Sequence, residues 1–190
     1  MAGSGLMKEE KCIVLDFLPH GYPDRRHAEP IAQVIGTSFF TLLEVIPREG
    51  VNLRQEEEVY IGEGKRDKIR FIKGQMNYRD LTNQAQSMLP EIAEQLVKSN
   101  EQRFVEFFNK GTVITPRMHQ FQLLPGIGKK HLMDILDERK KKPFESLKDL
   151  AARVKLFPDP MKTVVRRVLG ELQNDEKYYL FVAKSKKRFE

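Results

Sequence analysis

The first third of the chain consists of short runs of β-branched and aromatic residues separated by turn-rich segments. Five such runs occupy residues 11–17, 31–35, 39–46, 59–61 and 69–72. Turn signals lie between them, for example at residues 19–24 and 48–50. We therefore predict a small β-barrel of OB-like type over residues 1–80, because closure of a barrel removes exposed strand edges. Other small barrels share this pattern.

From Thr82 onward the hydrophobic period becomes helical. Apolar residues recur three and four positions apart from Ala85 to Phe108, and Gly111 follows as a natural helix terminator. This pattern predicts a connecting helical segment over residues 81–111. Pro90 lies within it, so we expect one helix to end near Leu89 and a second to begin at Pro90. At helical spacing, the phenylalanines are expected in the core.

Residues 115–139 contain the most informative stretch of the sequence. Thr115 and Pro116 suit the start of a short helix, and a second apolar periodicity runs from Leu132 to Leu136. Between them stands the sequence LPGIGKK, residues 124–130. The proline and first glycine of this sequence are expected to stop the first helix and turn the chain. Ile127 would then lie between the two helices, and Gly128 would begin the second one.

The residues 124–130 resemble the turn of a helix-hairpin-helix motif. In such a turn the N–H groups of Gly126, Gly128 and Lys130 point outward at a helix N-terminus. Unpaired donors and the helix dipole together favour an anion there. Lys129 and Lys130 add positive charge. A site built from backbone donors binds phosphate without reading sequence. We assign Gly126, Ile127, Gly128, Lys129 and Lys130 to nucleic-acid binding.

A second, eroded copy of the hairpin is predicted to follow, completing a domain over residues 112–174. A loop leads into a helix that ends near Val154, and Asp159 with Pro160 begins another. The intervening turn has no glycine, two prolines and an aspartate, so we expect this copy to be structural. Arg166 and Arg167, expected opposite the valines of the last helix, are candidates to extend the basic surface.

The last 16 residues, 175–190, form a separate segment. Lys177–Lys184 has the composition of a strand that would return to the barrel, and the basic residues 185–188 follow it. The cluster Lys140–Lys142 lies just after the second hairpin helix. Its lysines suit a helix C-terminus as well as they suit nucleic acid.

Charge is distributed unevenly along the chain. Residues 117–190 contain 18 Lys and Arg against 10 Asp and Glu, whereas residues 1–116 contain 15 against 17. A basic block of this kind is typical of proteins that bind the phosphate backbone, and also of a merely lysine-rich surface. Cys12 is the single cysteine, which excludes internal disulfides and cysteine-rich metal sites. No apolar run is long enough for a membrane span, and the start of the chain does not resemble a secretory signal. We expect a cytoplasmic protein that does not bind membranes.

Two further features follow only from resemblance. In the helix-hairpin-helix family, backbone carbonyls at positions matching Gln122, Leu124 and Ile127 hold a monovalent cation that bridges to the phosphate; we expect no other cofactor and no resident metal. Base-excision glycosylases with this hairpin use a lysine at the position of Lys130 and an aspartate further along, for which Asp149 is a poor match. The order of strands, helix, hairpin and basic ending resembles an uncharacterised archaeal family whose members are described at most as nucleotide- or RNA-binding.

The sequence thus favours an α+β protein that binds nucleic acid without catalysis, with a sequence-nonspecific grip on phosphate. RNA is slightly favoured over DNA, because relatives of the predicted barrel hold single strands in a groove. One alternative is an adaptor that docks on the transcription, repair or ribosome-maturation machinery through a protein partner. The remaining alternative, a glycosylase or lyase, lacks the helical framework of those enzymes.

Overall fold

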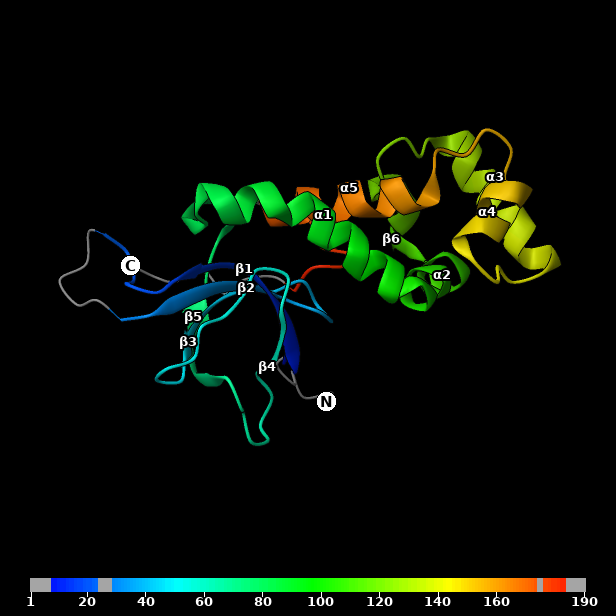
Figure 1. The fold of residues 1–190 in the computed structure, drawn as a ribbon. Helices are drawn as coiled ribbons and strands as arrows, with labels where there is room; N and C mark the ends of the chain where they lie inside the picture. The colour runs from blue at the N-terminus through cyan, green and yellow to red at the C-terminus, as the bar shows by residue number, and fades with distance from the viewer. Residues whose placement is uncertain (1–7, 24–28, 174–175, 184–190) are drawn as a thin grey trace, which may run out of the picture. The chain divides into compact units, whose positions relative to one another are not determined.

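The computed structural model describes residues 8–23, 29–173 and 176–183 of a mixed α+β protein (Figure 1). The chain divides into two compact units. The first comprises residues 1–92 and 171–190, and the second comprises residues 93–170. The predicted connecting segment, 81–111, is therefore shared between the units.

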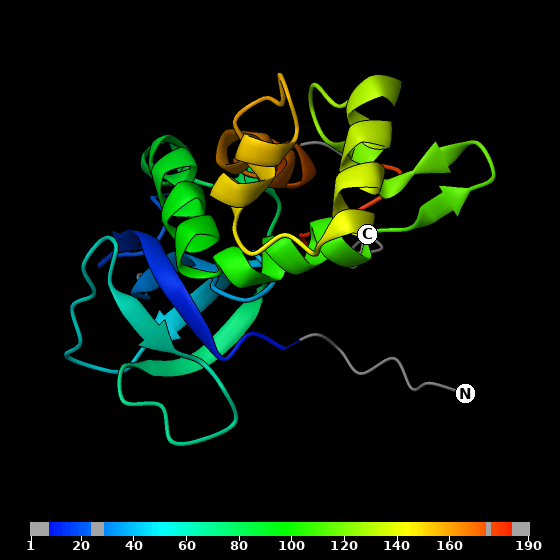
Figure 2. The same cartoon turned by 90° about the vertical axis from the view of Figure 1, so that its right-hand side faces the viewer.

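The first unit contains a five-stranded antiparallel sheet with the order β4-β1-β2-β3-β5. Its strands are β1 (Lys11–Leu18), β2 (Ile31–Gly36), β3 (Leu42–Pro47), β4 (Glu58–Tyr60) and β5 (Ile69–Gln75). Register shifts in the β1–β2 and β3–β5 pairs mark bulges in β1 and β5, which bend strands, and the sheet curls (Figure 2). The predicted five strands are confirmed. Among the described residues, however, β4 and β5 are the edges of an open sheet, so backbone pairing does not close a barrel.

The concave sheet has an apolar core to which every strand contributes. Its most buried strand is β2, in which all six residues are buried. The polar Gln33 of this strand is fully buried. Its side-chain NH2 group donates to the hydroxyl of Tyr22 and the carbonyl of Asp80, and its side-chain oxygen accepts from the N–H of Thr82. Cys12 also lies in this core, where burial raises the pKa of its thiol. The cysteine is therefore structural, since a thiol with a raised pKa is a poor nucleophile.

Two helices follow the sheet and a short 3-10 turn, η1 (Tyr78–Asp80). Helix α1 spans Asn83–Ser99 and contains Pro90, and α2 spans Glu101–Lys110. The prediction of a break at Pro90 is wrong: the helices separate at Asn100, whose side-chain amide donates to the carbonyl of Leu96. Apolar burial along α1 compensates for the one hydrogen bond that the proline cannot make. None of the described helices has the length and apolar character needed to cross a membrane.

The second unit continues with a small β-ribbon and three helices. Strands β6 (Val113–Thr115) and β7 (Met118–His119) pair and lead into the 3-10 helix η2 (Gln120–Leu123). Helices α3 (Lys129–Lys141), α4 (Leu147–Arg153) and α5 (Pro160–Gln173) follow. The predicted helix start at Thr115 and Pro116 is wrong, because Thr115 ends β6 and Pro116 lies in the turn of the ribbon. Proline suits a β-turn as well as a helix start.

The segment after α5 returns to the first unit, although not as the predicted strand. The carboxylate of Glu171, which is 2% exposed, accepts hydrogen bonds from the N–H groups of Leu180, Phe181 and Val182. The N–H of Ala183 donates to the carbonyl of Phe39. Three N–H groups of this segment therefore bond one buried carboxylate, and not the backbone of a neighbouring strand as its composition suggested. The basic residues 185–188 lie outside the described residues.

Candidate nucleic-acid interface

The turn between η2 and α3 has the backbone form that its glycines and proline predict. Gly126 lies in the left-handed region, at φ +81°, and the N–H of Ile127 donates to the carbonyl of Leu124 at 3.2 Å. Ile127 is 7% exposed, so its side chain points into the unit as expected. Gly128 is the N-cap of α3, and a Cβ added there would meet no heavy atom within 4 Å. The space in front of this helix start is open.

The start of α3 has no side-chain cap and no acidic residue in its first turn. By contrast, Ser146 caps α4 and Asp159 accepts a hydrogen bond at the start of α5. The N–H groups of Gly126, Gly128 and Lys130 donate to no backbone carbonyl among the described residues. The side chains of Lys129 and Lys130 are exposed. The turn before α3 therefore presents backbone donors that have no backbone partner in the described part of the chain, beside two exposed lysines.

The turn between α4 and α5 repeats this form although it has no glycine. The N–H of Phe157 donates to the carbonyl of Val154 at 3.3 Å, and Leu156 is left-handed at φ +57°. Leu156 thus stands where the first turn has Gly126. Its side chain is 85% exposed, whereas that of Phe157 packs against Phe108 at 6.1 Å between ring centroids. Sequence analysis missed this correspondence, because leucine gives no signal of a left-handed residue.

His131 joins the two turns. Its Nδ1 lies 3.2 Å from the carbonyl oxygen of Gly126, and its Nε2 lies 3.0 Å from that of Leu156. Pro158 of the second turn lies beside Gly126, 3.2 Å from the position that a Cβ would occupy there. The two turns are therefore neighbours on the surface of the second unit. Nothing in the sequence indicated that His131 bridges the two turns, because no motif assigns a role to this histidine.

The two arginines of α5 have different environments. Arg166 is exposed, as predicted. Arg167 is 8% exposed, and its Nη1 donates to the carbonyl of Leu123 at 3.2 Å. The expectation that both arginines face solvent is therefore wrong for Arg167, whose side chain fixes the end of η2 beneath the first turn. The positive charge of Arg166 remains available at the surface of α5.

Arg139 fixes α3 to the preceding helix. Its Nη1 donates to the carbonyls of Phe108, Asn109 and Gly111, which end α2. Its guanidinium carbon lies 5.6 Å from the centroid of the buried Phe121 ring, and burial lowers its pKa. A cation at a helix C-terminus complements both the unpaired carbonyls and the dipole. This contact orients the helix whose start carries the exposed lysines.

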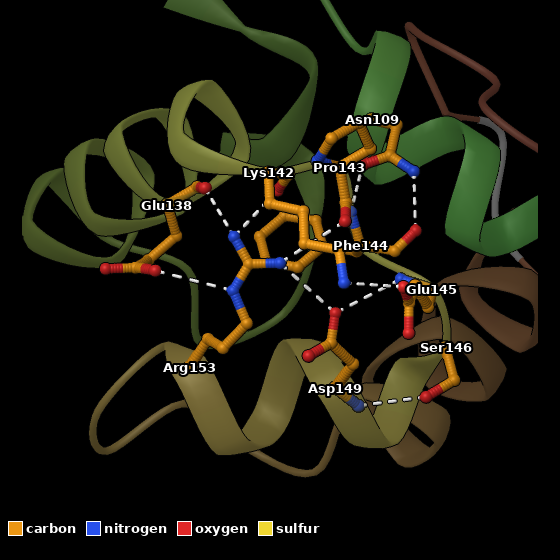
Figure 3. A network of polar contacts seen from close by, with 9 residues as sticks. All are labelled: Asn109, Glu138, Lys142, Pro143, Phe144, Glu145, Ser146, Asp149 and Arg153. Atoms are coloured by element: carbon orange, nitrogen blue, oxygen red, sulfur yellow. Dashed lines mark hydrogen bonds and ion pairs between the residues drawn. The ribbon is translucent and has the colours of Figure 1, made fainter.

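A second arginine, Arg153, locks the far end of α3 to α4 (Figure 3). Its guanidinium donates to the carbonyls of Lys142 and Pro143 and pairs with Asp149 at 3.1 Å. It also pairs with Glu138 at 3.4 Å and lies 4.6 Å from the ring centroid of Phe144. Asn109 joins the same loop to α2 through two bonds with the backbone of Phe144. These contacts make the connection between the two hairpins rigid.

The cluster Lys140–Lys142 is paired with acids. Lys140 pairs with Asp137, Lys141 with Glu138 and Lys142 with Glu145. These lysines are therefore partly neutralised. Lys129 and Lys130, by contrast, make no ion pair with any described residue.

Of the two residues that the glycosylase alternative names, Lys130 is exposed and Asp149 is engaged in other contacts. Asp149 accepts from the N–H of Glu145 and pairs with Arg153, and these contacts lower the pKa of its carboxyl. It lies in the first turn of α4 and is part of the lock shown in Figure 3. Within the described residues, no three His, Cys, Asp or Glu side chains are close enough together to hold a metal ion.

The carbonyls that resemblance assigns to a monovalent cation are suitable ligands. Pro125 has no N–H, so it cannot continue the 3-10 pattern onto the carbonyl of Gln122. The carbonyl of Leu124 accepts from Ile127 and keeps a lone pair. That of Ile127 accepts from no backbone N–H among the described residues. These three carbonyls are therefore candidate ligands for such a cation.

The sheet unit offers a second exposed combination of aromatic and basic residues, on the edge strand β5. Phe71 is 37% exposed, and the guanidinium carbon of Arg70 lies 5.3 Å from its ring centroid. Lys73, two residues further along, is also exposed and pairs with Glu44 at 2.7 Å. An aromatic ring flanked by cations is a common surface for stacking unpaired bases.

Comparisons with known proteins give relatives over nearly the whole chain. A family model described as "Protein of unknown function (DUF655)" matches residues 8–183. The uncharacterised protein MJ0038 of Methanocaldococcus jannaschii is 45% identical over 176 residues, which cover 92% of this chain and 80% of that protein. The crystal structure of Af1531 from Archaeoglobus fulgidus is similar with a TM-score of 0.82 at 47% identity, covering 92% of this chain and 100% of that one. Both relatives are archaeal.

Proposed function

We propose that this chain, which belongs to the DUF655 family of proteins of unknown function, binds nucleic acid by its sugar-phosphate backbone and performs no catalysis. One observation carries the proposal. The uncapped start of α3, with Lys129 and Lys130 exposed beside it, is held against a second turn of the same backbone form. The two turns together correspond to a tandem helix-hairpin-helix arrangement, in which the first turn grips a phosphate.

The chemistry of the grip is that of an anion at a helix N-terminus. Phosphate oxygens accept from the N–H groups of Gly126, Gly128 and Lys130, and the helix dipole adds attraction. Lys129 and Lys130 contribute charge without fixing geometry. Because backbone donors meet phosphate and not base edges, the binding is independent of sequence. Arg166 is assigned to the edge of this surface.

A monovalent cation belongs to the same proposal. The carbonyls of Gln122, Leu124 and Ile127 would hold it, and its charge would add to the attraction for phosphate. Arg167, beneath the turn, keeps the adjacent carbonyl of Leu123 fixed and takes no part in holding the ion.

RNA is proposed as the slightly preferred ligand because of the curled sheet, which we interpret as a relative of the OB-like barrels. Phe71 with Arg70 on strand β5 provides a surface on which an unpaired base can stack. Single-stranded RNA offers the unpaired bases that such a stacking contact requires.

Fluorescence anisotropy with single-stranded RNA, duplex RNA, single-stranded DNA and duplex DNA over a salt series tests the proposal. The Lys129→Ala/Lys130→Ala variant should bind each at least about 10-fold more weakly at low salt. On duplex DNA, its log–log salt slope should be shallower by roughly 2, at about 0.9 per phosphate contact. The matched control is Lys140→Ala/Lys141→Ala, which removes the same charge from the other end of the same helix.

The comparison between the two double variants decides the outcome. Equal losses of affinity would mean that only the total positive charge matters, and the phosphate site at the start of α3 would be rejected. Weak binding by the native chain, unchanged in both variants, would reject nucleic-acid binding altogether and favour a protein partner.

A further inference from the structure

We propose that Leu156, at the tip of the second hairpin turn, is an apolar wedge that inserts against the bases of the bound nucleic acid beside the gripped phosphate. This inference rests on the proposed function and gives the second turn a contact of its own. Sequence analysis assigned that turn a purely structural role. The structure shows one residue of it in an unusual situation.

The exposure of Leu156 is the first observation. At 85% it is the most exposed large hydrophobic residue in the described part of the chain, ahead of Val113 at 66% and Met133 at 54%. The side chains on either side of it in the turn differ in character, since Lys155 is charged and exposed while Phe157 packs inward on Phe108 and His131. Contact with an apolar surface would remove almost the whole leucine side chain from water.

The backbone of Leu156 is the second observation. Its φ of +57° is in the left-handed region, which costs free energy for any residue with a Cβ. The equivalent residue of the first turn is Gly126, which adopts this region freely. A turn that serves only as a connection is best made with glycine or asparagine. Leu156 therefore combines a strained backbone with an exposed apolar side chain, and both are unfavourable in the isolated protein.

The position of Leu156 is the third observation. The ring of His131 contacts the carbonyl of Gly126 through one nitrogen and that of Leu156 through the other. The leucine is thus held one imidazole ring away from the first turn. A nucleic acid whose phosphate is bound by Gly128 and Lys130 brings its sugars and bases past Leu156.

The chemistry of the contact follows from the side chain. Leucine has no donor or acceptor, so it cannot read a base edge. Apolar side chains that enter the minor groove wedge between base steps and partly unstack them. The phosphate grip and the wedge would therefore act together: the first turn fixes the backbone, and the second distorts the neighbouring base step. Both contacts are independent of sequence.

The variant Leu156→Asn tests this inference, because asparagine tolerates the left-handed region and removes the apolar surface. The probes are a duplex DNA and a single-stranded RNA, each carrying one 2-aminopurine whose fluorescence rises when it unstacks. We expect the native chain to raise the fluorescence on binding and Leu156→Asn to abolish the rise. Affinity should fall roughly 5- to 10-fold, as expected for losing part of the burial of one leucine. The salt slope should not change.

The control is Val113→Thr, which makes another exposed aliphatic residue polar on strand β6 and should change neither signal. If Leu156→Asn binds as tightly as the native chain and gives the same fluorescence rise, the wedge is rejected while the phosphate grip stands. If Lys129→Ala/Lys130→Ala also binds as tightly as the native chain, both the wedge and the proposed phosphate site are rejected. A melting temperature in Leu156→Asn equal to or above that of the native chain confirms that a lost signal does not come from unfolding.

Discussion

Among single residues, His119 shows most directly how burial changes the protonation of a side chain. The ring is 6% exposed, and its Nδ1 accepts from the N–H of Phe121 at the start of η2. Burial lowers the pKa of His119, and the nearby charge of Arg139 lowers it further, against a smaller raising contribution from a hydrogen bond with the backbone of Gly111. The neutral ring is therefore the form that the fold accommodates.

A pH dependence of stability follows. The unfolded chain binds a proton at His119 more readily than the folded chain does, so protonation favours unfolding. The contribution of His119 to stability is complete above the ordinary histidine pKa of about 6.5 and is lost as pH falls below it. His119→Asn retains an N-cap acceptor and does not titrate. Urea unfolding at pH 7.5 and pH 5.0 measures the free energy of unfolding. Between these pH values it should fall more for the native chain than for His119→Asn, and equal falls would contradict this account.

The role of a residue was predictable from the sequence where its type alone determines its backbone conformation or burial. Gly126 and Ile127 adopt the expected backbone and burial, because a left-handed turn followed by an apolar residue leaves few alternatives. Leu156, His131 and Arg167 were not predictable in this way. Their exposure and partners depend on how two turns 30 residues apart meet in space.

At the scale of elements, α1 tolerates a proline in its interior. Pro90 is exposed and lies in the middle of the helix, where its missing N–H leaves the carbonyl of Gln86 without its usual partner. Burial of Leu89, Ile92 and Ala93 on the other face keeps the helix continuous.

We expect Pro90→Ala to stabilise the protein by about 1–3 kcal/mol, because alanine restores the hydrogen bond and relieves the clash with the preceding turn. Thermal unfolding followed by circular dichroism would measure this as a higher melting temperature. Glu91→Ala, at the neighbouring exposed position, should leave it nearly unchanged. A lower melting temperature in Pro90→Ala would show that the proline is required where it stands.

The elements also show where periodicity is sufficient for prediction. Short runs of β-branched and aromatic residues between turns predicted the strands, and the three-and-four spacing predicted the helices. Two predictions from local sequence were wrong for the same reason: the residues in question are compatible with two different structures. Thr115 and Pro116 suit a β-turn as well as a helix start. The predicted strand Lys177–Lys184 has the composition of a strand, but its residues 180–182 bond a buried glutamate instead.

At the scale of the whole molecule, the basic half of the sequence contains both hairpin turns. Much of its charge is neutralised locally, as in the Lys140–Lys142 cluster and around Arg153. The start of α3 is different, with open space before Gly128 and two exposed lysines. We propose that phosphate binds at this helix start.

The variant Gly128→Asp tests that claim most directly. Gly128 has the extended N-cap conformation, φ −90° and ψ −176°, and room for a side chain, so an aspartate there can accept from the free N–H groups of α3. It would stabilise the helix while occupying the place of the phosphate with its own negative charge. We predict a melting temperature equal to or above that of the native chain, together with a loss of RNA and DNA affinity of roughly 10-fold or more in low salt. Native affinity in a folded Gly128→Asp protein would contradict the account.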